Sequence, residues 1–245
     1  MRQFSPVASL KDIQIVYAED SVHVYPKIIA GMRHLIGIPK ENITHFLQLD
    51  AAAKFLEKKM DRPTFVILDN TTSPSKTRGL ELAKSLLERK SEFPNLNLVT
   101  VSSNEINFPH FGEGKYLKDL QDLGGEYWFK GNDGNIMLLW LGECMRTGQV
   151  IPRAEWLSNL GLESSYPKVD RRNLIEDSII YELCDRLVNA PNDEEVAQIL
   201  KGKKMSSQID LEIGDFFNLP SKEVITRLGV PPRGIEGQPH PSKES

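Results

Sequence analysis

The chain has 245 residues, enough for one large domain or two small ones, and its 40% hydrophobic and 26% charged residues are typical of a globular protein. A formal net charge of −4 excludes an overall basic footprint for nucleic acid, so any DNA contact needs a local patch. No apolar stretch reaches the roughly 18 residues of a membrane helix, and the start MRQFSPVASLKD lacks the apolar core of a signal peptide. These features predict a cytoplasmic protein.

Strand-like and helix-like segments alternate over the first 148 residues. Short runs rich in β-branched and aromatic residues predict strands at 13–18, 43–47, 65–68, 96–101 and 127–129. Apolar residues at helical spacing predict helices at 24–36, 51–60, 79–89, 117–123 and 136–145. Five βα units in series predict an α/β fold, a doubly wound five-stranded parallel sheet with helices on both faces.

Only helices are expected after Gly148. The pattern predicts them at 154–160, 173–189, 193–200, 206–217 and 221–228, followed by a tail rich in Pro and Gly that we expect to be unfolded. The predicted organisation is therefore a doubly wound domain over 1–149, a small all-α domain over 150–232 and a disordered tail over 233–245.

Polar residues end four of the five predicted strands. Glu19 and Asp20 follow the first strand, Asp69 ends the third, Ser102 and Ser103 end the fourth, and Lys130 ends the fifth. In a doubly wound sheet these ends lie side by side at the ligand-binding edge. Three carboxylates at one edge repel one another and call for a hard cation such as Mg²⁺. With a hydroxyl and an ammonium nearby, the set is suited to moving a phosphoryl group onto an aspartate.

The segments IVYAED, FVILD, LVTVSS and YWFK, in this order and at about these spacings, resemble the receiver domain of two-component response regulators. The resemblance covers roughly residues 12–148 and implies a CheY-like fold. It implies that Asp69 accepts a phosphoryl group from a sensor histidine kinase or a phosphotransfer protein. It further implies that Glu19, Asp20, Asp69 and the backbone carbonyl of Thr71 hold Mg²⁺.

The same resemblance implies roles for three further residues. Ser102 would hydrogen-bond a phosphoryl oxygen, Lys130 would pair with the phosphate, and Tyr127 would be the aromatic residue whose inward swing accompanies activation. Each site residue also has a plainer interpretation: Asp69 as a loop cap, Lys130 as a surface lysine, Ser102 as a turn serine and Tyr127 as a core residue.

The chain departs from the family's pattern in three places. Gly131 stands after Lys130, where the family usually has proline. The loop after Asp69 is long, with Pro74 and Gly79 displaced towards the carboxyl end. The segment after Ser102 is also long, and its stretch 104–114 replaces part of the helix that most regulators use for dimerising.

The sequence of the helical half gives fewer indications of function. Residues 199–229 weakly resemble the last part of phage-repressor-type helix-turn-helix domains, and Lys201, Lys203 and Lys204 form its dense basic cluster, which is either a DNA contact or a solvated turn. Acidic residues outnumber basic ones between Val150 and Gly234, which disfavours DNA. The four-residue apolar repeat of 173–189 is either core or a dimer seam.

Two hypotheses for the output follow. In the first, the helical half binds DNA, as a dimer, and regulates transcription under the control of phosphorylation at Asp69. In the second, the helical half binds another protein, with or without phosphoryl turnover. No nucleophile-base pair or metal spacing predicts an enzyme in this half. The two cysteines, Cys144 and Cys184, are expected to be reduced and packed.

Overall fold

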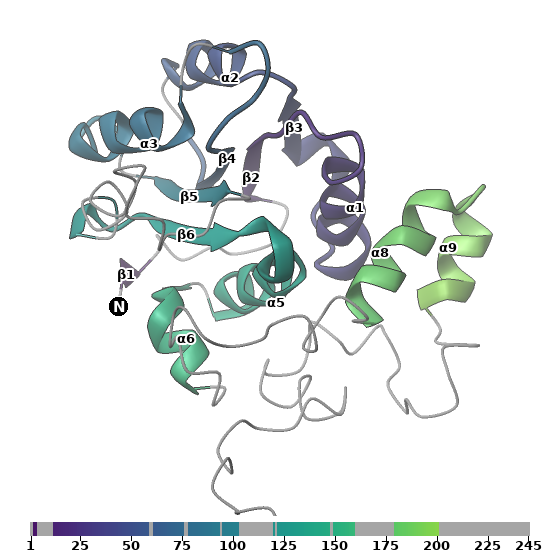
Figure 1. The fold of residues 1–245 in the computed structure, drawn as a ribbon. Helices are drawn as coiled ribbons and strands as arrows, with labels where there is room; N and C mark the ends of the chain where they lie inside the picture. Colours follow the sequence, from purple (N-terminus) through teal and green to yellow (C-terminus); the bar gives the residue numbers. More distant parts are fainter. Residues whose placement is uncertain are drawn as a thin grey trace, which may run out of the picture.

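The computed structural model describes residues 2–3, 12–58, 61–75, 78–93, 95–102, 120, 122–147, 149–159 and 179–200. Its centre is a five-stranded parallel sheet with the order β3-β2-β4-β5-β6 (Figure 1). The strands are β2 (Gln14–Ala18), β3 (Ile43–Phe46), β4 (Thr64–Asp69), β5 (Leu96–Ser102) and β6 (Glu126–Phe129). Counted along the chain, this is the 2-1-3-4-5 order of flavodoxin-like doubly wound folds. The predicted fold class is confirmed.

The middle strand β4 is buried along its whole length. Its side chains alternate between the two faces of the sheet, as the pleat requires. Phe65 and Ile67 belong to the core on one face, and Val66 and Leu68 belong to the core on the other. A continuous apolar run is therefore what a strand covered on both faces needs.

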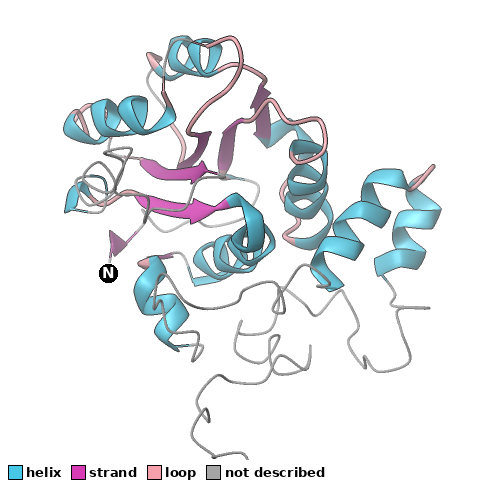
Figure 2. Ribbon diagram, viewed as in Figure 1, coloured by secondary structure: helices cyan, strands magenta, loops and turns pink. Residues whose placement is uncertain are grey.

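Helices cover both faces of the sheet (Figure 2). The helix α1 (Tyr25–Ala30), the π-helix η2 (Gly31–Leu35) and α5 (Lys130–Thr147) pack on the face that carries Ile15 and Trp128. The helices α2 (Leu49–Leu56) and α3 (Gly79–Glu88) pack on the opposite face. A single 3-10 turn, η3 (Lys40–Asn42), precedes β3.

The predicted helix 24–36 is interrupted at Gly31, where the α-helix α1 passes into η2. A Cβ atom at Gly31 would come into close contact with Leu138 of α5 and Cys184 of a later helix. Three helices thus meet at this glycine. A π-turn adds a residue to the turn and shifts the register of the side chains that follow, which a periodicity of 3.6 does not predict.

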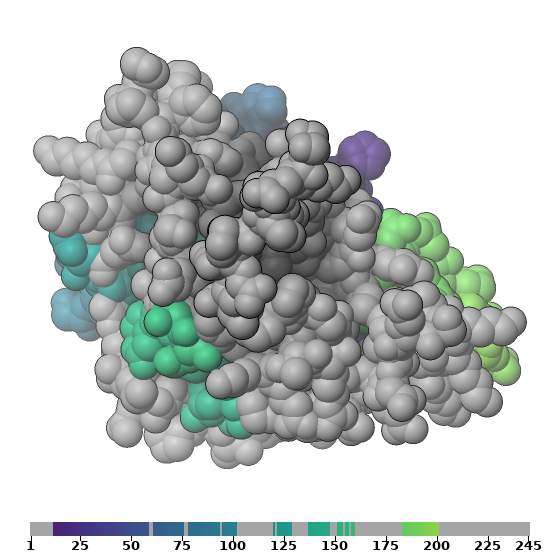
Figure 3. Space-filling view, turned by 60° about the horizontal axis from the view of Figure 1, so that its bottom comes forward, coloured from purple at the N-terminus to yellow at the C-terminus, as the bar shows by residue number. Residues whose placement is uncertain are grey.

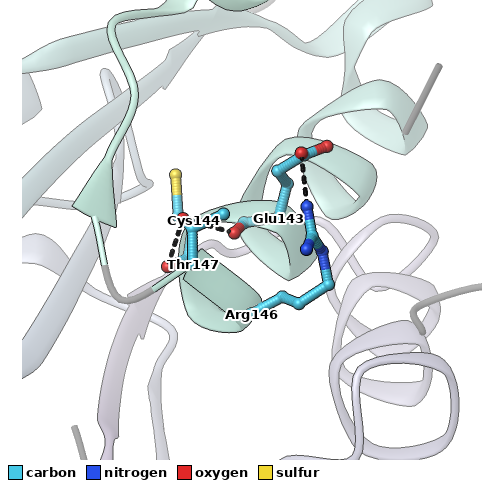
Figure 4. A network of polar contacts seen from close by, with 4 residues as sticks. All are labelled: Glu143, Cys144, Arg146 and Thr147. Carbon is cyan, nitrogen blue, oxygen red and sulfur yellow. Dashed lines mark hydrogen bonds and ion pairs between the residues drawn. The ribbon is translucent and has the colours of Figure 1, made fainter. Parts of the chain in front are cut away.

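The predicted start of α5 at Ile136 is wrong, because the helix begins at Lys130, directly after β6. Gly131, Asp133 and Gly134 disfavour helix by intrinsic propensity, and tertiary context overrides that preference. At the other end, Figure 4 shows how the helix closes. The Thr147 hydroxyl lies 2.8 Å from the Glu143 carbonyl oxygen and 3.4 Å from that of Cys144, and Arg146 pairs with the Glu143 carboxylate at 2.8 Å.

The expectation that no strand follows Gly148 is also wrong. β7 (Gln149–Val150) pairs antiparallel with β1 (Arg2–Gln3). Two-residue strands are too short to show a periodicity of two, and their pairing joins the two ends of the sheet domain. The helices α6 (Arg153–Asn159), α8 (Ile179–Asn189) and α9 (Asp193–Leu200) follow. Within the described residues, α6 begins one residue before its prediction, α8 ends at the predicted residue and α9 has the predicted bounds.

The helix α8 packs on α1 and on α9 (Figure 1). Leu183, Cys184 and Leu187 of α8 are buried in the same core as the sheet residues Ile15 and Trp128. Lys27 of α1 forms an ion pair with Asp185 at 2.8 Å. In Figure 3 the light green atoms of this helix pair lie along one side of the molecule. The described part of the helical half thus shares a core with the sheet.

Several predictions lie outside the described residues: the helices 206–217 and 221–228, the tail, Ser103, the stretch 104–114, and Lys201, Lys203 and Lys204. The predicted domain boundaries stay predictions. Within the described ranges, no helix is both long and apolar enough to cross a membrane.

Candidate functional site at the carboxyl edge of the sheet

The site lies where the order of the strands reverses. After β2 the chain passes first to β3 on one side and then to β4 on the other. The loops that leave β2 and β4 therefore run in opposite directions, and in open α/β sheets this reversal point is the position of the ligand-binding crevice. Glu19 and Asp20 directly follow β2, and Asp69 is the last residue of β4.

The three predicted acids meet in this crevice. One carboxylate oxygen from each of Glu19, Asp20 and Asp69 lies within 4.8 Å of the other two. Glu19 is 1% exposed and Asp69 is 4% exposed. Like charges held this close, with two of the three groups buried, need a counter-charge. The all-oxygen donor set fits a hard divalent cation such as Mg²⁺, which keeps several of its waters.

Backbone N–H groups hold two of the carboxylates. The Ser21 N–H donates to Oε1 of Glu19 at 3.0 Å, and the Ser73 N–H donates to Oδ2 of Asp20 at 2.8 Å. The second bond joins the loop after β2 to the loop after β4. Burial raises the pKa of the nearby Tyr17 phenol well above its usual value, and the charges of Glu19 and Asp69 raise it further. Tyr17 is therefore a neutral neighbour of the acids at physiological pH.

The long loop after Asp69 is anchored on the start of α2. The first N–H groups of a helix have no partner within the helix, and the residue before α2, Gln48, makes no capping bond. Thr72 Oγ1 accepts the Leu49 N–H at 2.9 Å, and Ser75 Oγ accepts the Asp50 N–H at 3.3 Å. The Thr72 hydroxyl donates in turn to Ser75 at 3.1 Å. This loop thus supplies hydrogen-bond acceptors for the start of a helix that is distant in the chain.

Asn70 and Gly79 close the same loop behind Asp69. The Gly79 N–H donates to the Asn70 carbonyl at 2.9 Å, and the Leu80 N–H donates to Asn70 Oδ1 at 3.3 Å. The Asn70 N–H donates to Val101 of β5 at 2.9 Å. A side chain at Gly79 would overlap the carbonyl oxygen of Asp69. The start of α3 therefore lies directly against the backbone of Asp69.

Two further predicted site residues, Ser102 and Lys130, lie at the predicted edge. Ser102 ends β5, next to the strand of Asp69, and Lys130 follows β6 as the first residue of α5. Thr71 is exposed, two residues after Asp69. Tyr127 is 2% exposed and packs in the core below α2 and α3. The roles of these four residues stay predictions.

Sequence reasoning did not identify Asn70, Thr72, Ser75 or His45 as parts of this site. His45 lies on β3, and its Nε2 is 2.8 Å from the Glu19 carbonyl oxygen. No spacing rule links it to Glu19, because the two residues meet through strand pairing. The one signal for His45 in the sequence was that it is a polar residue near the end of a predicted strand.

No protein-family model and no curated protein sequence matches this chain. Three examples of solved structures that are similar to it at low identity follow. The receiver domain of NtrX from Brucella abortus is 18% identical, with 55% of this chain and 99% of that chain covered and a TM-score of 0.38. The response regulator DrrB, a Thermotoga maritima OmpR/PhoB homolog, is 12% identical, with 90% and 91% covered and a TM-score of 0.41.

The third is a response regulator protein from Burkholderia pseudomallei with a phosphorylated aspartic acid, a calcium ion and citrate. It is 15% identical, with 78% of this chain and 93% of that chain covered and a TM-score of 0.41. These values are too low to support a function for this chain. The fold rests on the strand order and register described above, and the function must be argued from the site.

Proposed function

We propose that this chain is a receiver of two-component signalling that is phosphorylated on Asp69. The observation that carries the proposal is the meeting of Glu19, Asp20 and Asp69 within 4.8 Å at the reversal point of the sheet. A structural role alone does not account for three carboxylates in one partly buried crevice, because their mutual repulsion destabilises the fold. A site that binds a cation and receives a phosphoryl group does account for them.

In this proposal the carboxylate of Asp69 is the nucleophile. It ends a strand that is buried along its length, so its backbone is fixed while its side chain reaches the crevice. One carboxylate oxygen attacks the phosphorus of a phosphohistidine on a sensor kinase or phosphotransfer protein. A bond from phosphorus to oxygen forms, and the bond from phosphorus to the imidazole nitrogen breaks. The electron pair leaves with the imidazole, and Asp69 becomes an acyl phosphate.

Glu19, Asp20 and Asp69, with the backbone carbonyl of Thr71, would hold Mg²⁺. When bound, the ion neutralises the carboxylates and the charge on the phosphoryl oxygens. Ser102 and Lys130 would add a hydroxyl donor and an ammonium at the same edge. The hydrogen bond from Ser73 to Asp20 keeps the loops on either side of the crevice in a fixed relation.

The test is the intact mass of the protein after incubation with Mg²⁺ and phosphoramidate, a small-molecule donor with a P–N bond. We expect the wild type to gain the mass of one phosphoryl group and Asp69→Asn to gain none. Asp61→Asn, at an exposed acid outside the cluster, is the matched control and is expected to behave as wild type. An unmodified wild type that nevertheless binds Mg²⁺ would overturn the proposal.

The output of the phosphorylated chain lies in its helical half. We propose regulation of transcription through DNA bound by the region that contains Lys201, Lys203 and Lys204. The acidic first turn of α9, with Asp193, Glu194 and Glu195, favours the alternative of a protein partner. Fluorescence anisotropy of labelled DNA at two salt concentrations separates the two, since affinity for DNA falls steeply with salt when phosphate contacts carry it. The absence of salt-dependent binding by the phosphorylated form would favour the protein partner.

A further inference from the structure

His45 is fixed between two aromatic rings beside the acid cluster. It lies on the edge strand β3 and is half-buried. Its ring stacks on Tyr25, the first residue of α1, with centroids 4.2 Å apart and planes at 26°. It also contacts Tyr17 of β2, with centroids 5.7 Å apart. The two rings restrict rotation of the imidazole, so its nitrogen atoms have defined directions.

One of these nitrogens reaches the backbone of Glu19. Nε2 lies 2.8 Å from the Glu19 carbonyl oxygen, and because a carbonyl oxygen only accepts, the ring carries its proton on Nε2. The next residue of β3, Phe46, accepts the Glu19 N–H at 3.0 Å. Two consecutive residues of β3 therefore hold the backbone of Glu19 on both sides.

The carbonyl that His45 contacts belongs to the peptide group between Glu19 and Asp20. This group is planar, so its orientation sets the last backbone angle of Glu19 and the first of Asp20. Those two angles decide the directions in which the two neighbouring side chains leave the backbone. Both residues lie just beyond the end of β2.

We propose that His45 is a positioning residue for cation binding. Its Nε2–H fixes the peptide group so that the carboxylates of Glu19 and Asp20 converge with that of Asp69 on one divalent ion. The inference rests on the cation site of the proposed function and extends it to a residue that does not touch the ion. Hydrogen bonds to groups behind the ligands commonly change metal affinity by about 10- to 100-fold.

The experiment measures binding of Mn²⁺, an ion suited to the same oxygen ligands, from the free-ion signal in electron paramagnetic resonance. His45→Phe keeps an aromatic ring between the tyrosines and removes the donor, and we expect affinity to fall about tenfold or more. His45→Gln places an amide nitrogen where Nε2 lies and is expected to stay close to wild type. His34→Phe, a half-buried histidine on η2, is the matched control and is expected to bind as wild type.

A comparison of His45→Asn with His45→Gln tests the inference even if His45→Phe does not fold. His45→Asn has the same amide on a shorter side chain that does not reach the Glu19 carbonyl, so we expect it to bind Mn²⁺ more weakly than His45→Gln. Equal affinities for Gln and Asn, or a folded His45→Phe that binds as wild type, would overturn the role of His45.

The same titration separates this inference from the proposed function. If Asp69→Asn weakens Mn²⁺ binding and no His45 variant does, the inference fails and the cation site stands. If the wild type binds no Mn²⁺, both fail. If binding depends on His45 but phosphoramidate does not modify Asp69, the inference stands and phosphorylation fails.

Discussion

Gly79 stands at a position where the structure leaves no room for a side chain. A Cβ atom there would overlap the Asp69 carbonyl oxygen, a backbone atom of the central strand that has no freedom to move aside. We therefore expect Gly79→Ala to lower the free energy of unfolding by about 1–3 kcal/mol, as overpacking does. Urea unfolding followed by tryptophan fluorescence measures it, because Trp128, Trp140 and Trp156 are all buried.

Ser85→Ala, at an exposed position of the same helix, is the control for this change. It should stay within about 0.5 kcal/mol of wild type, the scale of helix propensity. A Gly79→Ala protein as stable as wild type would mean that α3 does not lie against Asp69. The overlap in Gly79→Ala should also displace the Asp69 backbone. Because a nucleophile must be held in position, the proposed phosphorylation of Asp69 should then be slower.

The acid cluster makes stability depend on the divalent cation. In excess chelator, Asp69→Asn removes one of three crowded charges and should raise the free energy of unfolding by roughly 1–3 kcal/mol. Added Mg²⁺ should stabilise the wild type by about 2.7 kcal/mol at one hundred times the dissociation constant. The variant should gain much less. Urea unfolding of both proteins, each with chelator and with Mg²⁺, measures the four free energies of unfolding. An equal increase in this free energy with Mg²⁺ in both proteins would mean that the ion binds elsewhere.

The three acids of the site could be predicted from the sequence, and the residues that hydrogen-bond around them could not. Glu19, Asp20 and Asp69 follow apolar runs, so a parallel sheet brings them to one edge whatever the loops do. Thr72 and His45 act through hydrogen bonds to residues that are distant in the chain, Leu49 and Glu19. Those partners depend on strand order and loop path, which no local pattern records.

At the scale of elements, strands were predicted more closely than helix ends. The β4 prediction differs from the structure by one residue at each end, because the buried strand extends beyond the apolar run to the polar residues Thr64 and Asp69. The start of α5 was missed by six residues, since Gly131 and Gly134 favour a loop by propensity alone. The change from α1 to the π-helix η2 was not predicted, because it coincides with close helix packing at Gly31 and not with a local sequence preference.

The packing of α8 on α1 has a consequence at high pH. Burial raises the pKa of the Cys184 thiol from 9.0 to about 12, with Asp185 raising it further and Lys27 lowering it. Above pH 9 the unfolded thiol loses its proton while the folded one keeps it, so the free energy of unfolding falls as pH rises from 9 towards 12. The loss approaches 1.4 kcal/mol per pH unit for one such group.

Cys184→Ala lacks this linkage. We therefore expect the stability advantage of wild type over Cys184→Ala to shrink between pH 9 and 12, measured by urea unfolding at several pH values. Val188→Ala, at an exposed position of the same helix, should differ from wild type by a constant amount over this range. An advantage that does not change with pH would indicate a solvated thiol, and α8 would then not be docked on α1.

For the whole molecule, the question is whether the helical half and the sheet fold as one unit. Leu187 of α8 is 4% exposed and shares a core with sheet residues. If the two parts form one cooperative unit, Leu187→Ala should destabilise the entire chain by about 2–5 kcal/mol. All three tryptophans lie outside α8 and α9, so their fluorescence reports unfolding of the sheet and the helices beside it. We expect one transition, displaced to lower urea with an unchanged slope.

Val188→Ala is the matched control, because Val188 is the next residue of the same helix and is 39% exposed. It should leave the transition nearly unchanged, as surface substitutions do. If α8 belonged to an independent domain, Leu187→Ala would leave the tryptophan transition where it is in the wild type. A displaced transition would mean that the helical half and the sheet unfold as one cooperative unit through the packing of α8 on α1. Under the proposed phosphorylation of Asp69, this packing is a described contact that links the sheet to the helical half.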